Sequence, residues 1–465
     1  MKIKGRDILS RLVAIVAFAL ISVMQNGTSA NAQNGINSPY SRYGFGIISD
    51  RSMGFNKGMA GVAQGFRGGS IVNVGNPASY SAVDSITALF DFGLSLSNGN
   101  YKMGEIQQNA KNSSLDYIAL HFRAAQGLGV AVGVLPFSNI KYDFESTSTT
   151  INGSKEITSS STYTGDGGLH QVFFGMGWRP FRPISIGANI SYLYGDYAHI
   201  STTSFSDASI FSNVRSYVAD LSTYALDLGI QYVQPVSKSS TLTFGATYGF
   251  GHDISNRAKR ISSRINASQL QASSDTITLK DAFQLPHTIA FGLAYKYLDK
   301  WTVGADCEIQ KWGDCKFPVT VDEGGKDEFV SRKGQLNDRI KISLGGTLLP
   351  DAYSSSLFNR IQYKAGFYYS KSYANADFTG TLSDKPYEYG LSAGVSIPID
   401  NQNAWRMRPR INLTAQWVHT NIPYADNIAF SQTGNVMKRE LVENYLRLCI
   451  GLTFNEIWFN KWKVQ

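Results

Sequence analysis

The sequence alternates between apolar and polar residues over stretches of about ten residues, and this pattern recurs along the chain. In residues 86–97 the apolar face consists of Ile86, Ala88, Phe90, Phe92, Leu94 and Leu96. The opposite face holds Thr87, Asp91, Gly93, Ser95 and Ser97. Successive side chains of a β-strand point to opposite faces, so the pattern predicts strands with one apolar and one polar face.

Fourteen segments follow this pattern, and long connections alternate with short ones between most of them. The segments are 86–97, 116–124, 127–135, 169–178, 184–194, 222–232, 241–250, 287–297, 301–312, 339–348, 360–369, 386–397, 409–419 and 443–454. A soluble β-sandwich also alternates, but its connections follow no such rule, whereas outer-membrane barrels combine long extracellular loops with short periplasmic turns. The sequence therefore predicts an all-β protein, a 14-stranded antiparallel transmembrane β-barrel over residues 86–465.

The tryptophans indicate that the short turns lie at the periplasmic membrane interface. Trp178 ends a strand that runs toward the periplasm, and Trp301 begins a strand that leaves it. Trp405 falls in a short turn, and Trp458 and Trp462 follow the last strand. All five are expected near one membrane interface, as in an aromatic girdle.

The first residues have the layout of a cleaved secretory signal peptide. Four basic residues precede the apolar run LVAIVAFALISVM, and Ala30-Asn31-Ala32 provides small residues for cleavage. A membrane anchor is the alternative, but a spanning helix needs roughly 20 apolar residues and this run is shorter. We therefore expect residues 1–32 to be removed and the protein to lie in the outer membrane of a Gram-negative bacterium.

Composition adds few candidates for chemistry. The mean hydropathy of −0.16 resembles that of a soluble chain, although alternating strands with polar loops give the same average. The net charge of +8 falls to about +5 without residues 1–32, and the remaining basic residues form no nucleic-acid motif. The six His residues have no metal-ligand spacing, and no nucleophile or phosphate-binding motif occurs. The sequence thus predicts no enzyme, metal or cofactor.

Residues 33–85 are rich in Gly and lack the alternation. They either extend from the barrel as a tail or fold into its lumen. A barrel of fourteen strands is wide enough for its interior to need filling, and small residues suit close packing against the wall. We therefore expect an N-terminal hatch, or plug, in the lumen.

Three short motifs resemble the FadL/TodX family of outer-membrane transporters for long-chain fatty acids and other hydrophobic compounds. These are Gly58-Met59-Ala60-Gly61-Val62-Ala63, Asn76-Pro77-Ala78-Ser79-Tyr80, and the strand Gly129–Leu135 that runs into Pro136-Phe137. Ser79 and Ser138 stand where that family usually has Gly. The resemblance covers nearly the whole mature chain, and it implies a hatch behind fourteen strands.

By this resemblance, Asn76, Pro77 and Ala78 belong to the hatch, while Gly133, Pro136 and Phe137 mark a possible lateral gate. Proline has no backbone N–H and cannot complete a ladder in a central strand, which is an independent reason to expect an interruption at Pro136. The alternative is that Pro136 simply begins the loop 138–167.

Charged residues at inward positions are the other candidates for the lumen. They are Asp91, Asp227, Asp306, Glu308, Lys341, Lys364, Glu388 and Arg447. We expect most of them to pack barrel against plug, with Lys341, Lys364 or Arg447 as alternative contacts for an anionic head group. The loop 251–286 carries Arg257, Lys259, Arg260 and Arg264, which either meet lipopolysaccharide phosphates or are simply solvated.

Two functions from different classes fit this sequence. The first is passive uptake of hydrophobic small molecules such as long-chain fatty acids, which predicts an elongated apolar cavity between hatch and wall. The second is a surface scaffold or shuttle that binds exported proteins, as in type IX secretion. A general diffusion porin comes third, because about 50 residues of plug would obstruct the conductance.

Overall fold

The computed structural model describes residues 37–85, 87–103, 106–152, 155–265, 271–323, 326–375, 386–399, 409–425 and 438–457. The predicted signal peptide lies outside the described residues, as do Trp405, Trp458 and Trp462. Among the described residues, no helix has the length and apolar character that a membrane span requires.

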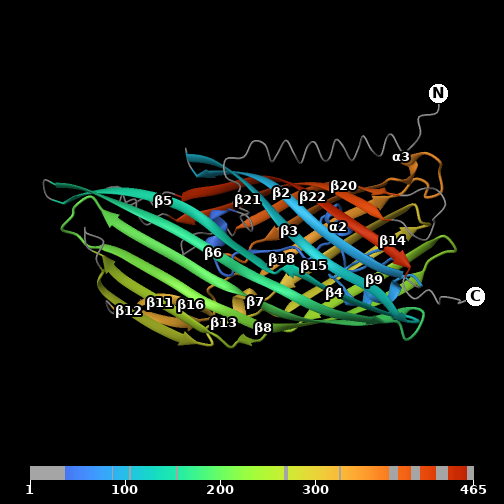
Figure 1. The fold of residues 1–465 in the computed structure, drawn as a ribbon, viewed down its shortest axis with the longest axis horizontal. Helices are drawn as coiled ribbons and strands as arrows, with labels where there is room; N and C mark the ends of the chain where they lie inside the picture. The colour runs from blue at the N-terminus through green and yellow to red at the C-terminus, as the bar shows by residue number, and fades with distance from the viewer. Residues whose placement is uncertain are drawn as a thin grey trace, which may run out of the picture. The chain divides into compact units, whose positions relative to one another are not determined.

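Fourteen antiparallel strands close into a barrel, as the alternation predicts (Figure 1). They are β2 (Thr87–Met103), β3 (Ile106–Ala125), β4 (Leu128–Pro136), β6 (Lys155–Trp178), β7 (Ile184–Phe205), β8 (Ser212–Pro235), β9 (Ser240–Gly249), β14 (Thr288–Tyr297), β15 (Trp301–Gln310), β18 (Arg339–Leu348), β19 (Gln362–Lys371), β20 (Tyr387–Pro398), β21 (Arg410–Ala425) and β22 (Lys438–Ile457). The first and last strands pair from Thr87↔Ile457 to Met103↔Leu441, which closes the ring.

Further short elements lie in the plug and in the long loops. The plug contains η1 (Pro39–Arg42), β1 (Ile47–Ile48), α2 (Gly54–Lys57) and η2 (Pro77–Ala82). The loops contain β5 (Ser138–Asn152), β10 (Asp253–Ile254), β11 (Arg257–Ile265), β12 (Gln271–Lys280), β13 (Phe283–Gln284), η3 (Trp312–Asp314), β16 (Phe317–Glu323), β17 (Lys326–Arg332) and α3 (Leu357–Arg360).

The outer surface of the barrel carries an apolar band with aromatic residues at both edges. On β8, Tyr224 and Tyr232 are 55% and 41% exposed, and Leu228 and Ile230 lie exposed between them. Trp178 is also exposed, at the end of β6 where the short turns lie. Exposed apolar surface of this extent, bounded by aromatic girdles, is what a lipid-facing barrel presents. The barrel therefore spans a membrane.

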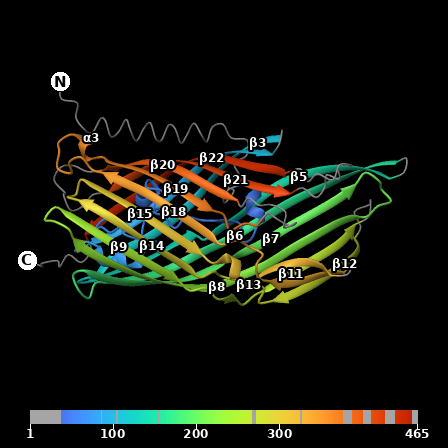
Figure 2. The ribbon, with the colours of Figure 1, turned by 180° about the vertical axis from the view of Figure 1, so that it is seen from behind.

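One side of the wall is much taller than the membrane requires. β6 and β8 each have 24 residues, whereas a strand crosses the bilayer with roughly 9–11. Beyond the end of β9, β8 pairs with β11, and β11 pairs with β12 (Figure 2). This side therefore continues as a curved sheet past the apolar band, at the end of the barrel opposite the short turns.

Candidate functional site

The predicted hatch residues lie at the beginning of η2, deep in the lumen. The Asn76 side chain accepts a hydrogen bond from the Ala78 N–H (3.1 Å) and caps the short helix. Its amide group donates to the carbonyl of Gln64 (3.0 Å), in the plug, and to that of Ile230 (3.3 Å), in the wall. Pro77 and Ala78 are also buried. Asn76 thus joins two parts of the plug to β8.

Glycines on the inner face of the wall allow the plug to touch the strands directly. A Cβ atom on Gly245 would lie 1.8 Å from the carbonyl oxygen of Gln64, and one on Gly187 would lie 2.4 Å from the Pro77 carbonyl carbon. Gly345 approaches the Met59 backbone in the same way. Any larger residue at these positions would push the plug away from the wall, which explains why Gly recurs at inward positions.

Ion pairs also fasten the plug to the wall. Arg51 binds Asp227 of β8 at 2.8 Å. The negative charge of this carboxylate is the main reason why the pKa of the Arg51 guanidinium is raised. Lys57 binds Asp116 of β3 at 2.5 Å, and both side chains are about nine-tenths buried. The plug is therefore held by charge on two sides of the barrel.

Two further charged wall residues bind the plug. Lys341 lies 3.4 Å from Asp50. The Asp306 carboxylate accepts hydrogen bonds from the backbone N–H groups of Ala63 (2.6 Å) and Gln64 (2.9 Å). Asp227, Asp306 and Lys341 were predicted from inward parity, and all three meet plug residues.

The other predicted lumen residues have partners that belong mainly to the wall. Asp91 accepts from the Tyr117 and Thr453 hydroxyls, Glu308 from Gln310 and Arg339, and Glu388 from Tyr368. The Lys364 ammonium donates to Asn412 and lies 4.1 Å from the centre of the Phe55 ring in the plug. The Arg447 guanidinium lies over the Tyr445 ring.

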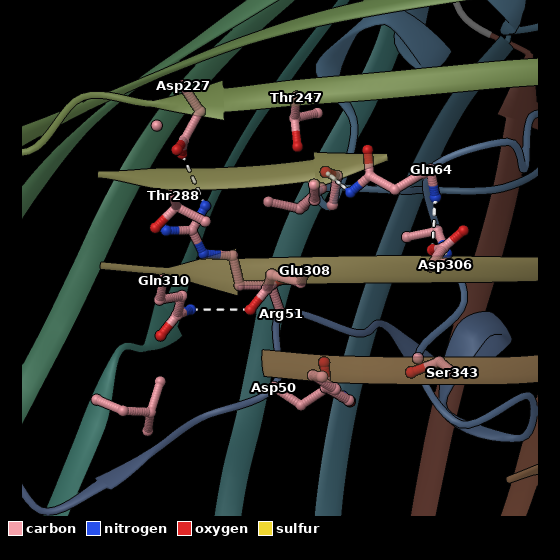
Figure 3. Close-up of a pocket in the computed structure, with 18 of the residues that line it drawn as sticks. Asp50, Arg51, Gln64, Asp227, Thr247, Thr288, Asp306, Glu308, Gln310 and Ser343 are labelled. Carbon is pink, nitrogen blue, oxygen red and sulfur yellow. Dashed lines mark hydrogen bonds and ion pairs between the residues drawn. The ribbon is translucent and has the colours of Figure 1, made fainter. Parts of the chain in front are cut away.

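A polar chamber lies between the plug and strands β8, β9, β14, β15 and β18 (Figure 3). Its volume is about 70 Å³, and the charged residues that line it are Asp50, Arg51, Asp227, Asp306, Glu308, Arg339 and Lys341. A water molecule occupies about 30 Å³ in the liquid, so the chamber has room for only a few waters. The sequence predicts an elongated apolar cavity between hatch and wall, and the chamber found there is instead small and charged.

The ladder of the wall is interrupted at Pro136, next to Phe137, which also lines the chamber. The ladder between β3 and β4 ends at Ile118↔Val134, so Gly133 lies one rung before its end and Pro136 beyond it. After Phe137 the chain continues as β5, which pairs with β6 and not with β3 among the described residues. Among the described strands, residues 106–117 of β3 and residues 142–152 of β5 therefore have no ladder partner on the sides that flank a gap in the wall.

The first described residues of the plug, 37–49, lie at this gap, and we call them the strap. Its strand β1 pairs with β5 at Ile47↔Asn139 and Ile48↔Ser138. Ser38 N–H donates to the Lys141 carbonyl (2.9 Å), and the Ser41 hydroxyl bonds to both the N–H and the carbonyl of Lys141 (3.0 Å each). The strap is thus hydrogen-bonded to the free edge of β5.

Beside the strap, the lumen is apolar. Phe45 of the strap contacts the rings of Phe283, Trp312 and Phe317, with centroids 5.4–5.8 Å apart. Ile140 and Tyr142, on the inner face of β5, belong to the same buried cluster. This cluster, which we call the aromatic cap, fills the part of the lumen next to the gap.

No group of three or more His, Cys, Asp or Glu side chains that could hold a metal ion occurs within the described part of the chain. The arrangement instead combines a charged chamber with room for a few waters, an aromatic cap and an interrupted wall.

Comparison with known families identifies the family of this chain. The family model described as BamG matches residues 12–465. The chain belongs to the BamG family. A search of curated proteins finds no match.

Solved structures share the fold at low sequence identity. A FadL homologue from Pseudomonas aeruginosa is 11% identical over 88% of this chain and 99% of its own, with a TM-score of 0.57. The toluene transporter TodX of Pseudomonas putida is 14% identical over 88% and 99%, with a TM-score of 0.56. TbuX, a toluene transporter of Ralstonia pickettii, is 12% identical over 87% and 98%, with a TM-score of 0.54. The expected FadL/TodX-like fold is confirmed.

Proposed function

We propose that this BamG-family barrel is an outer-membrane channel for passive uptake of hydrophobic small molecules, with long-chain fatty acids among its ligands. The observation that carries the proposal is the gap between β3 and β5, which borders the aromatic cap. An apolar molecule that leaves water for such a cluster is stabilised by about 25 cal/mol for each Å² of apolar surface buried. Two solved structures of the same fold are described as toluene transporters, which supports this ligand class.

The charged chamber favours a sideways route over a straight one. An apolar ligand in the chamber would separate Arg51, Asp227 and their neighbours from water without replacing their hydrogen bonds, which is unfavourable. At the gap, in contrast, the strap is the obstacle, and Gly133, Pro136 and Phe137 lie where the wall is interrupted. In this proposal the strap moves, while Asn76, Pro77 and Ala78 keep the rest of the hatch in place.

A disulfide between strap and wall tests this route. Ile47 and Asn139 are Cα partners in a ladder, at the spacing that a disulfide can bridge. The variant Ile47→Cys/Asn139→Cys, made with Cys307, Cys315 and Cys449 replaced by Ser, would fix the strap when oxidised. The matched control is Thr202→Cys/Val214→Cys, which joins the paired strands β7 and β8 away from the gap.

Uptake of radiolabelled oleate and toluene is measured in cells that lack the native protein and express each variant. We expect the oxidised strap variant to import at least tenfold more slowly than after reduction, and the control to be unaffected. Equal uptake in both redox states would refute the route. Uptake that does not depend on the protein at all would refute the channel function.

A surface scaffold for exported proteins is the second candidate, and the tall side of the wall favours it. β12 pairs only with β11 among the described strands, and residues 142–152 of β5 pair only with β6. Such exposed edges can accept a strand from another chain. Deletion of the hairpin end, residues 148–159, leaves Phe144 and the strap contacts in place and should abolish co-purification of exported proteins. Unchanged co-purification would count against the scaffold.

A further inference from the structure

Three cations lie on the outer face of the tall wall, and we call Arg257, Lys259 and Lys280 the cation cluster. Arg257 and Lys280 are directly opposite one another on the paired strands β11 and β12, and Lys259 follows two residues along β11. All three side chains are exposed. Like charges directly opposite one another destabilise a sheet, so this placement has an unfavourable electrostatic energy unless an anion neutralises it.

The residues that alternate with Arg257 and Lys259 along β11 show which face of the sheet these cations occupy. Ala258 and Arg260 are 3% and 5% exposed, and Arg260 donates to Thr320 and to the Asp327 carbonyl of the hairpin β16–β17 inside the wall. Because side chains alternate along a strand, Arg257 and Lys259 point outward.

The cation cluster lies just beyond the apolar band. Lys259 is the ladder partner of Val218 on β8, and Val218 is on the same face of β8 as Tyr224, six residues further along. Tyr224 ends the apolar band and stacks on His252, with ring centroids 4.2 Å apart. At about 3.3 Å per residue along a tilted strand, Lys259 is on the order of 10–20 Å beyond the aromatic edge, so the cluster lies outside the hydrocarbon core on the head-group side of the band.

Two outward carboxylates lie near the cluster, and Asp220 is two residues from Val218 on the same face of β8. Asp196 and Asp220 are exposed and directly opposite one another on β7 and β8. Among the ion pairs of the described residues, none joins either carboxylate to Arg257, Lys259 or Lys280. The cation side chains are therefore exposed and outside any of these ion pairs, so they can reach a phosphate, while the two carboxylates can approach divalent cations that accompany it.

We propose that the cation cluster binds the phosphate groups of a phosphorylated glycolipid in the outer leaflet of the membrane. The cations hold the phosphate, and Asp196 and Asp220 approach the divalent cations that accompany it. A lipid is favoured over free phosphate because the cluster faces away from the lumen and borders the lipid-facing band. Each cation near a membrane surface contributes about fivefold to such binding, so three contribute on the order of 100-fold.

The purified barrel is tested with three probes: bisphosphorylated lipid A, lipid A with both phosphates removed, and inorganic phosphate. The test variant is Arg257→Gln/Lys259→Gln/Lys280→Gln. The matched control, Arg179→Gln/Lys238→Gln/Lys300→Gln, removes three exposed cations from the short turns at the other end. Native mass spectrometry gives the lipid retained per barrel, and heat-modifiable migration in gels checks that each barrel is folded.

We expect wild type and control to bind bisphosphorylated lipid A at least tenfold more tightly than the dephosphorylated form, and the test variant to lose at least tenfold in affinity. Equal retention by a folded test variant would overturn the proposal, as would equal binding of the two lipids. Displacement of the lipid by millimolar inorganic phosphate would also overturn it, because the site would then take free phosphate.

Discussion

Replacing Lys57 with Met should loosen the plug, and the structure allows the size of this effect to be worked out. The Lys57 ammonium is 2.5 Å from the Asp116 carboxylate, and the two side chains are 8% and 11% exposed. Asp116 also accepts hydrogen bonds from the hydroxyls of Ser95 (2.8 Å) and Ser114 (3.2 Å). Met keeps the length and apolar stem of Lys57 and removes only its charge.

At an effective dielectric constant of about 20, unit charges this close attract each other by about 7 kcal/mol, which offsets the loss of hydration of both groups. Breaking a buried pair on one side typically costs 3–5 kcal/mol, because the remaining charge is left buried without its partner. The two serine hydroxyls continue to stabilise Asp116, so we expect a loss near the lower limit, about 3 kcal/mol. This corresponds to roughly a 150-fold rise in the undocked fraction of the plug.

Hydrogen exchange of the plug amides in nanodiscs measures that fraction directly. Protection of residues 51–66 should fall on the order of 100-fold in Lys57→Met and remain unchanged in Lys300→Met, which removes an exposed cation from a short turn. The double variant Lys57→Met/Asp116→Leu should recover most of the loss, since it leaves no buried charge. Unchanged protection in Lys57→Met, or a double variant less protected than the single one, would refute this account of how the plug is held.

Three further substitutions test other contacts of the lumen. Gly245→Ala should displace the plug and lower its hydrogen-exchange protection at least tenfold, because the added Cβ would overlap the Gln64 carbonyl. The control Gly346→Ala should have little effect, since the nearest atom to its added Cβ is 3.2 Å away. Asn76→Ala should destabilise the plug by about 2 kcal/mol, because it removes the η2 cap and two buried hydrogen bonds. Hydrogen-exchange protection of residues 73–82 equal to that of the wild type would contradict this. Trp312→Ala should destabilise the aromatic cap by about 3–5 kcal/mol, since the ring is fully buried, and an unchanged midpoint for unfolding in guanidinium would argue against it.

The sequence was sufficient to predict the barrel because every strand satisfies the same local rule. One face meets lipid and the other the lumen, so the alternation is visible without knowledge of which strands pair. Inward parity likewise predicts lumen positions for Asp227, Asp306 and Lys341, which contact the plug, since the face of a strand on which a side chain lies follows from its place in the alternation.

Asp116 shows where that rule fails. By parity with Ile118 it belongs on the outer face, yet its carboxylate binds Lys57 in the lumen. The ladder between β2 and β3 pairs Gly93 with Tyr117 and Leu94 with Leu115, so Asp116 is the extra residue of a β-bulge. A bulge depends on the pairing of two strands, and no pattern within one strand reveals it.

The plug residues were missed for a different reason. Arg51 and Lys57 occur in a Gly-rich segment without periodicity, and their partners are more than 50 residues away in the sequence. Only the folded barrel brings these charges together. The strap could not be predicted for the same reason, because its hydrogen bonds depend on the strand edge of β5 that the interrupted wall exposes.

The way in which plug and strap are held indicates which of them moves during the proposed uptake. Displacing the whole plug would separate Lys57 from Asp116, Arg51 from Asp227 and Asp306 from two backbone N–H groups, and the first of these alone costs about 3 kcal/mol. Freeing the strap breaks its hydrogen bonds to β5 and the bond from Ser38 to Glu443, at about 1 kcal/mol each. It also withdraws Phe45 from the aromatic cap, which costs about 3–5 kcal/mol. An apolar ligand that takes the place of Phe45 offsets this second cost, whereas it cannot replace the ion pairs of the plug. Movement of the strap is therefore the lower-energy way to open the gap when such a ligand binds. It follows that oleate should speed the exchange of the strap amides and leave that of residues 51–66 unchanged, and equal acceleration of both segments would instead indicate a plug that moves as one body.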